Sequence, residues 1–261
     1  MKNEFKIKSI WKERGFSFLI KTIYYRVFRK QIKNINYLTN LFSSKSGLEV
    51  GGPSRTFQDK RFIPIYGFLE NLDGCNFSNK TIWEGEIKNG MQYNYYRNKT
   101  GFQYISEATD LSLVESSKYD FIISCNCLEH VANPFKALEE WLRVVKSGGL
   151  ILILLPNKKH CFDHKRPVTE FAHLMEDFKN NTTEDDLTHL DEILELHDLE
   201  MDKPAGNLEQ FKKRSMSNFE NRALHHHVFS INLLKEIFSY FKIDVLLTDE
   251  EQDLVILGRK F

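Results

Sequence analysis

Short apolar runs, each followed by a polar or glycine-rich turn, recur along most of this chain. Unbroken apolar runs are typical of strands in a sheet that is covered on both faces. The runs that we interpret as strands are residues 48–50, 67–73, 102–106, 119–125, 150–155, 243–247 and 254–258. The last two flank an acidic turn, and they predict an antiparallel hairpin at the end of the sheet.

Two segments with helical apolar spacing lie between these strands. Asn133 and Pro134 are residue types favoured at the N-cap and first position of a helix, and helical spacing follows them. We expect Gly148 and Gly149 to end this helix. Residues 230–241 have a second amphipathic pattern and predict another helix.

Strands alternate with helices in residues 47–156 and again in residues 228–261. This order predicts an α/β core, a doubly wound, mostly parallel, seven-stranded Rossmann-like sheet that an antiparallel C-terminal hairpin closes. Residues 76–101 are polar without a clear period, and we expect a loop there. Residues 157–227 interrupt the alternation, so we interpret them as an insertion that covers the site of the core.

Residues 1–46 differ in composition from the rest of the chain. They contain eleven Lys or Arg residues and two acids, and residues 20–28 carry an apolar stripe with helical spacing. One interpretation is a helical arm whose apolar side covers the core or a partner subunit, which would make a homodimer. The other is a basic amphipathic arm that makes peripheral contact with an anionic membrane.

Composition excludes several classes of protein. The 261 residues have a formal net charge of zero and are 41% hydrophobic, so the chain is neither disordered nor a general polyanion binder. No basic stripe crosses the strand-end segments, which argues against a nucleic-acid partner. Cys125 and Cys127 lie in one predicted strand and are expected to be free thiols in a reducing compartment, which favours a cytoplasmic protein. No apolar run has the length of a membrane span, and no signal peptide is visible.

The end of the first predicted strand is rich in glycine. Gly51 and Gly52 follow Leu-Glu-Val, and glycine lets a ligand approach the backbone, although a purely structural turn would have the same pattern. Asp73 lies 24 residues beyond Glu49, at the end of the next predicted strand. An acid about 20 residues after such a turn suits a ribose diol, because a carboxylate can accept from both hydroxyls.

Four segments together resemble the class I S-adenosylmethionine-dependent methyltransferases. They are Leu-Glu-Val-Gly-Gly-Pro-Ser (48–54), Glu-Ala-Thr-Asp-Leu (107–111), Tyr-Asp-Phe-Ile-Ile-Ser-Cys-Asn-Cys-Leu-Glu-His-Val (119–131) and Leu-Arg-Val-Val-Lys-Ser-Gly-Gly-Leu-Ile-Leu-Ile-Leu-Leu-Pro (142–156). The resemblance runs from about residue 48 to residue 155 and resumes near residue 228. The chain departs from the family where Pro53 and Ser54 replace the usual third glycine.

The resemblance implies S-adenosylmethionine as cofactor and a role for each strand-end residue. The implied contacts are Glu49, Gly51 and Gly52 with the methionine part, Asp73 with the ribose, Thr109 and Asp110 with the adenine, and Asn126 beside the sulfonium. Asp110 could instead cap a helix. Glu129 is expected to cap or pair locally, and His130 is a candidate base.

Eight of the nine histidines lie between His160 and His227, inside the predicted insertion. The segment after the fifth strand and the segment before the last helix both belong at the rim of the sheet, so we expect them to meet above the methyl group of the cofactor. The candidate catalytic residues are His164, His226 and His130, and the candidate ligands of a divalent Fe, Mn, Ni or Zn ion are Asp163, His164, His225, His226 and His227. The alternative is that these histidines are structural and that residues 184–202 form a solvated acidic face.

The sequence therefore predicts an O-methyltransferase that acts on a small polar acceptor. A histidine base would take the proton of the acceptor hydroxyl, or a metal ion would polarise its oxygen. Lys158, Lys165 and Arg166 suit phosphate groups, so we expect a nucleotide-activated sugar for capsule or another surface polysaccharide. The alternatives are a nitrogen or lipid acceptor, or a non-catalytic protein that docks on a membrane.

Overall fold

The computed structural model describes residues 31–261, which divide into two units. The described part of the first unit comprises residues 31–43 and 55–68, with helix α2 (Ile35–Phe42) and the 3-10 helices η1 (Arg55–Phe57) and η2 (Tyr66–Phe68). The apolar stripe of the predicted arm lies outside the described residues. Its two interpretations, membrane contact and cover of the core or of a second subunit, therefore stay predictions.

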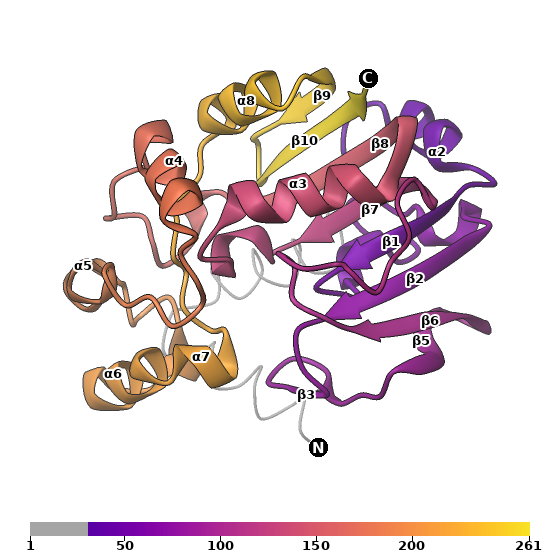
Figure 1. Cartoon of the computed structure of the whole chain (residues 1–261). Coiled ribbons are helices and arrows are strands. Elements are labelled where there is room, and N and C mark those ends of the chain that lie inside the picture. Colours follow the sequence, from indigo (N-terminus) through magenta and orange to yellow (C-terminus); the bar gives the residue numbers. More distant parts are fainter. Residues whose placement is uncertain (1–30) are drawn as a thin grey trace, which may run out of the picture. The chain divides into compact units, whose positions relative to one another are not determined.

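The second unit, residues 44–54 and 69–261, contains an eight-stranded mixed sheet. Its strands are β1 (Ser46–Val50), β2 (Asn71–Asn76), β5 (Gly90–Tyr96), β6 (Lys99–Ile105), β7 (Tyr119–Cys125), β8 (Val145–Pro156), β9 (Ile243–Asp249) and β10 (Asp253–Lys260). The order is β5-β6-β2-β1-β7-β8-β10-β9 (Figure 1). Strands β6, β2, β1, β7 and β8 are parallel, and β10 pairs antiparallel with both β8 and β9. The predicted Rossmann-like sheet with its closing hairpin is confirmed.

The loop predicted for residues 76–101 is wrong, because this segment contains β5 and the small ladder of β3 (Lys80–Thr81) with β4 (Gly85–Glu86). Strand β5 pairs antiparallel with β6 and adds an eighth strand at the edge of the sheet. The sequence of β5 is mostly polar because only Tyr93 and Tyr95, two residues apart, are buried. This alternation was the available signal for a strand with one covered face.

Two helices pack on one face of the sheet. Helix α3 (Pro134–Val144) begins as expected, with the Asn133 side chain accepting from the backbone N–H of Lys136. It ends at Val144, earlier than expected, because Gly148 and Gly149 lie in an irregular part of β8. Helix α8 (Ile231–Tyr240) begins at the N-cap Ser230, as predicted.

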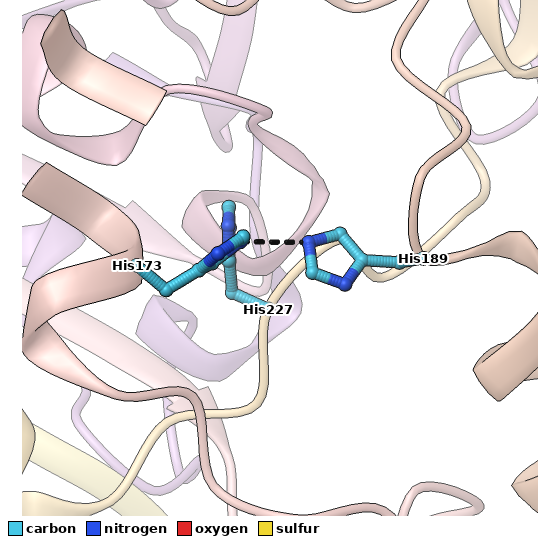
Figure 2. Close-up of side chains that lie close together, drawn as sticks. All are labelled: His173, His189 and His227. Atoms are coloured by element: carbon cyan, nitrogen blue, oxygen red, sulfur yellow. Dashed lines mark hydrogen bonds between the residues drawn. The ribbon is translucent and has the colours of Figure 1, made fainter. Parts of the chain in front are cut away.

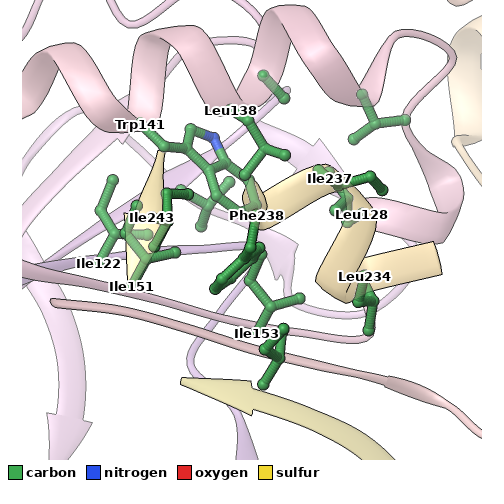
Figure 3. Close-up of a cluster of buried hydrophobic side chains, with 14 of the residues drawn as sticks. Ile122, Leu128, Leu138, Trp141, Ile151, Ile153, Leu234, Ile237, Phe238 and Ile243 are labelled. Carbon is green, nitrogen blue, oxygen red and sulfur yellow. The ribbon is translucent and has the colours of Figure 1, made fainter. Parts of the chain in front are cut away.

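The apolar faces of these helices meet the sheet in one continuous core. Figure 3 shows this cluster, to which Trp141 of α3, Phe238 of α8 and Ile153 of β8 contribute. The indole N–H of Trp141 donates to the carbonyl of Ala108 at 3.0 Å. The core therefore joins the helices to the strands whose ends form the candidate site.

Residues 157–227 add helices but no strand to the sheet. They contain η4 (Lys158–His160), α4 (Phe171–Asn180), α5 (Leu190–Leu196), η5 (Lys203–Ala205), α6 (Leu208–Met216) and α7 (Asn218–Asn221). Figure 1 shows these helices beyond the edge at which the parallel strands end. They have a small apolar cluster of their own around Ile193 and Phe211. Across residues 31–261, no helix has both the length and the apolar character needed to cross a membrane.

Asn133 joins this helical segment to the core. Its side chain is almost completely buried, caps α3 and donates from Nδ2 to the carbonyl of Asp177 in α4 at 3.0 Å. Ser230 makes the same kind of cap at α8. The two residues thus form a matched pair, one with a cap alone and one with a cap and a tertiary hydrogen bond.

We expect Asn133→Ala to lower the free energy of unfolding by about 2 kcal/mol, the sum of a cap and a buried hydrogen bond. Ser230→Ala should cost about 1 kcal/mol, because it removes the cap alone. Urea unfolding of both variants measures the difference. Equal losses would show that the bond from Asn133 to α4 contributes nothing.

Candidate active site

Strands β1 and β7 are neighbours in the sheet. The chain continues from β1 toward one edge of the sheet through β2 and β6, and from β7 toward the other edge through β8. In open α/β sheets, ligands bind outside the carboxyl ends of the strands at such a point. Gly51 follows β1 with φ +83° and Asn126 follows β7 with φ +51°. A Cβ on Gly51 would lie 2.8 Å from Cβ and Sγ of Cys127, so the turn itself requires glycine.

Glu49 and Gly52 form the inner support of this turn. The Glu49 carboxylate is fully buried, and it accepts from the Tyr93 hydroxyl at 2.7 Å and from the backbone N–H of Ser54 at 3.0 Å. The carbonyl of Gly52 accepts from Asn76 Nδ2 at 2.9 Å. Both residues therefore shape the strand-end loop from within the protein.

Asp73 does not occupy the strand end that we predicted for it. Strand β2 continues to Asn76, so Asp73 lies inside the sheet, three residues earlier. Its carboxylate accepts from the Tyr119 hydroxyl at 2.6 Å and from the backbone N–H of Phe102 at 2.9 Å, and it is almost completely buried. A ligand that binds outside the sheet meets the strand end at Asn76 instead.

Thr109 and Asp110 lie in the turns after β6, and no helix begins at Asp110. Asp110 is exposed, and it accepts from the backbone N–H of Ser112 at 3.0 Å. Hydrogen bonds with Ser112 hold the pKa of Asp110 below its usual range, so it is ionised near pH 7. This carboxylate is accessible to a ligand.

A small pocket lies beside the carboxyl ends of β7 and β8. The polar residues that line it are Glu129, Lys158, Cys161, Asp163, His225 and His227. Glu129 comes from η3 (Leu128–His130), directly after β7, whereas the others come from residues 157–227. As the sequence predicted, the two ends of that segment return to one rim of the sheet.

Glu129 is the unusual group in this pocket. Its side chain is only 2% exposed, and neither carboxylate oxygen accepts a hydrogen bond from another residue of the described chain. Burial raises the pKa of Glu129 to about 7, against the opposing effect of the nearby His225. The local cap or pair expected for Glu129 is thus not formed, and the carboxylate has no partner among the described residues.

His225 and Asp163 form a buried pair on the same wall, with 2.5 Å between Nδ1 and Oδ2. Burial lowers the pKa of His225, but the hydrogen bond and charge of Asp163 outweigh it and raise that pKa above its usual value. Burial raises the pKa of Asp163, but His225 and Arg166 outweigh this effect and hold the Asp163 pKa at about 2. With Nδ1 bound to Asp163, His225 has Nε2 left for another partner.

Arg166 holds this wall in place from behind. Its side chain is 2% exposed, and its guanidinium donates to Asp163 Oδ1 at 3.1 Å and to Glu192 Oε1 at 2.8 Å. It also donates to the carbonyls of His225 and His226 at 2.9 and 3.2 Å. Arg166 is therefore not the exposed phosphate-binding residue that the sequence predicted.

The predicted catalytic histidines do not form one group. His164 is on the surface, paired with Asp198 at 2.9 Å. His226 is buried against Asn218, with 3.0 Å between Nε2 and Nδ2. The ring of His130 lies 4.5 Å from that of His225, and its Nδ1 contacts the carbonyl of Leu224 at 3.1 Å.

Of the five predicted metal ligands, only Asp163 and His225 contact each other, and the other three have partners elsewhere. Asp163 bonds to His225, His164 to Asp198, His226 to Asn218 and His227 to Asp177. Adjacent histidines point in different directions, so His225, His226 and His227 contact three different groups of residues. Over residues 31–261, the histidine and acid side chains that do converge are Glu129 with His130 and His225, and His173 with His189 and His227.

Part of the chain is similar to a known protein family. Residues 70–153 match the family model described as "Methyltransferase domain". No curated protein matches the chain.

Solved structures of similar fold include several methyltransferases. One is a methyltransferase from Thermotoga maritima described as a possible histamine N-methyltransferase, with 16% identity over 92% of this chain and 95% of that chain, and a TM-score of 0.45. Another, from Methanosarcina mazei, has 13% identity over 89% and 99%, with a TM-score of 0.47. The 1,6-didemethyltoxoflavin-N1-methyltransferase of Burkholderia thailandensis, solved with S-adenosylhomocysteine, has 10% identity over 87% and 77%, with a TM-score of 0.45. Such identities carry no substrate from one protein to another.

We expect Arg166→Met to lower the free energy of unfolding by about 3–5 kcal/mol, because the variant removes one of the two cationic partners of the buried Asp163 and leaves two backbone carbonyls without their donor. The melting temperature should fall by roughly 6–20 °C. Lys165→Met is the matched control, since Lys165 is the exposed neighbour and lies 4.0 Å from Asp198. Thermal unfolding measures both, and an unchanged melting temperature in Arg166→Met would contradict this account of the wall.

Proposed function

We propose that this chain, whose residues 70–153 match a methyltransferase domain, is a class I S-adenosylmethionine-dependent methyltransferase that methylates a hydroxyl of a small polar acceptor bound beside Glu129. The observation that carries the proposal is the buried Glu129 carboxylate, which faces the pocket without a hydrogen bond from another described residue. A buried acid without a partner costs stability. A bound hydroxyl would supply the missing donor, which makes the pocket complementary to such an acceptor.

The strand-end loops fit the cofactor. Gly51 is exposed at the end of β1, Asn126 is exposed at the neighbouring strand end, and Asp110 is an accessible carboxylate. We assign the ribose side of the site to the end of β2 at Asn76, in place of Asp73. When bound, S-adenosylmethionine supplies a methyl group made reactive by its sulfonium.

Glu129 and His225 have separate tasks in this proposal. As the acceptor oxygen forms its bond to the methyl carbon and the carbon–sulfur bond breaks, the hydroxyl proton passes to the Glu129 carboxylate. A base positioned in this way contributes about 10²–10⁴-fold to the rate. His225, oriented by Asp163, can bind a second acceptor oxygen through Nε2. Arg166 keeps both His225 and Asp163 in position.

The lining of the pocket favours a polar group of the acceptor at its mouth. Lys158 lines the pocket, while Lys165 is exposed nearby in the chain. We therefore retain a nucleotide-activated sugar for a surface polysaccharide as the acceptor class, with one hydroxyl of the sugar directed at the pocket, without Arg166 as a phosphate ligand and without a metal ion in the reaction.

We expect Asp110→Ala to weaken binding of S-adenosylhomocysteine about tenfold or more, because a charged hydrogen bond to the adenine amino group is lost. Its melting temperature should stay near that of the unchanged protein, since Asp110 is exposed. Glu115→Ala, an exposed acid in the same connection, is the control. Isothermal titration calorimetry would refute the assignment by giving the same affinity for both variants. Gly51→Val is a poorer test, because Cys127 crowds that position with or without cofactor.

We expect Glu129→Gln to reduce kcat about 10²–10⁴-fold while leaving the affinity for S-adenosylhomocysteine unchanged. The assay offers methyl-labelled S-adenosylmethionine with a panel of nucleotide-activated hexoses, and mass spectrometry locates the methyl group. Glu139→Gln, on the exposed side of α3, is the matched control.

Full kcat in Glu129→Gln would rule out this carboxylate as the proton acceptor. Methylation of amines and of none of the sugars would replace the hydroxyl acceptor with a nitrogen one.

A further inference from the structure

Three histidines from separate segments of the chain converge beside the acceptor pocket, and one aspartate contacts two of them. His173 and Asp177 lie on α4, His189 lies just before α5, and His227 precedes α8; Figure 2 shows the three imidazole rings directed toward one another. Ligand atoms of the three histidines all lie within 4.8 Å of one another. Their separation in sequence means that the fold itself, rather than local spacing, has assembled the group.

The nitrogens and the carboxylate crowd a small space. His173 Nε2 lies 2.9 Å from His189 Nε2 and 3.2 Å from Asp177 Oδ2, and His227 Nε2 lies 3.0 Å from the same Asp177 oxygen. A tetrahedral ion with ligand bonds of 2.0–2.1 Å has ligand atoms about 3.3 Å apart. These three separations are near this value, and the three histidines already lie within 4.8 Å of one another; Asp177 and His189 would have to move closer together to share the ion.

Hydrogen bonds alone satisfy this group poorly. The Nε2 atoms of His173 and His189 face each other, so one must carry a proton and the other must present a lone pair. His173 Nε2 also faces the Asp177 oxygen, which His227 Nε2 contacts too. His173 Nε2 carries at most one proton, so it cannot donate fully to both His189 and Asp177, whereas a single divalent cation would bind all four atoms at once.

We propose that His173, His189, His227 and Asp177 bind one Zn²⁺ ion in a four-coordinate site. Three imidazole nitrogens and one carboxylate oxygen are ligands that zinc accepts, and four protein ligands complete its usual tetrahedral shell. The His227 and Asp177 side chains are 1% and 11% exposed, while that of His173 is 33% exposed. The site thus has a buried base and an open side through which an ion can enter.

This ion would hold residues 157–227 against the core beside the pocket. His227 itself lines the pocket, and its backbone N–H approaches the Glu129 carbonyl at 3.4 Å. Asp177 is joined to the start of α3 through Asn133. Because all four positions of the ion are filled by protein, we assign it a structural role in fixing the wall of the pocket. This inference does not depend on which molecule is methylated.

The test measures zinc itself. The full-length protein is stripped with a chelator, and Zn²⁺ is returned in competition with a chromophoric chelator while elemental analysis counts bound ions. We expect one ion per chain and at least about 100-fold weaker binding in His173→Ala and His189→Ala, since loss of a ligand costs more than loss of an outer-shell partner. His160→Ala, an exposed histidine in the same segment, should bind as tightly as the unchanged protein.

Two further measurements separate binding from folding. Zn²⁺ should raise the melting temperature of the unchanged protein and of His160→Ala but not of His189→Ala, because only an intact site stabilises the folded state. Co²⁺ in place of Zn²⁺ should give the intense visible absorption of a tetrahedral site. His173 and His189 are partly exposed, so these variants keep the test valid if His227→Ala fails to fold.

The proposal is overturned if the folded, unchanged protein takes up no stoichiometric Zn²⁺, or if His189→Ala binds it with unchanged affinity. It is also overturned if Glu129→Gln loses the ion while His189→Ala retains it. That result would locate the metal at Glu129, His130 and His225, the other convergent group.

Discussion

The buried guanidinium of Arg166 is the interaction on which the rest of the candidate site depends. It binds two carboxylates and two backbone carbonyls, and these contacts hold the segment after β8 against the segment before α8. Buried arginine is costly unless all its donors find acceptors, and the planar five-donor group is suited to several acceptors at once. Arg166 thereby orients Asp163, which in turn orients His225 toward the pocket.

Two buried acids, Asp73 and Glu129, differ in whether other residues satisfy their carboxylates. The Asp73 carboxylate accepts from Tyr119, Asn71 and the backbone of Phe102, so it stabilises the sheet from within. Glu129 has equal burial and no such partner among the described residues, and its pKa is raised to about 7. An unsatisfied buried acid is destabilising by itself, which supports a role for Glu129 in binding or catalysis.

The histidines divide in a related way. His225 is bound to a buried aspartate on the pocket wall, whereas His227 points to the group of His173, Asp177 and His189. His226 lies between them in sequence and bonds to Asn218. The proposed zinc site and the proposed acceptor site thus share the backbone of residues 225–227. A bound ion that fixes His227 would therefore also help to fix His225 on the pocket wall.

Much of the core followed from the sequence alone. Apolar runs locate β7, β8 and the closing hairpin because strands covered on both faces need them, and residues such as Asn133, Pro134 and Ser230 mark where the helices begin through local hydrogen bonding. These signals depend on neighbours in sequence. The edge strand β5 was missed since only one of its faces is buried. The end of β2 was misplaced because its polar residues Asp73 and Asn76 form hydrogen bonds with Tyr119 and Gly52 respectively.

The site was decided by the tertiary structure. The sequence indicated that the histidine-rich segments would return to one rim, but not which side chains would meet there. Arg166 looked like a phosphate ligand until its four acceptors were seen, and His173 and His189 had no local sign of partnership with His227. Asp177, four residues after His173 on α4, was the one local hint. Contacts between residues tens of positions apart depend on how helices pack on the sheet, and no periodicity in the chain records that packing.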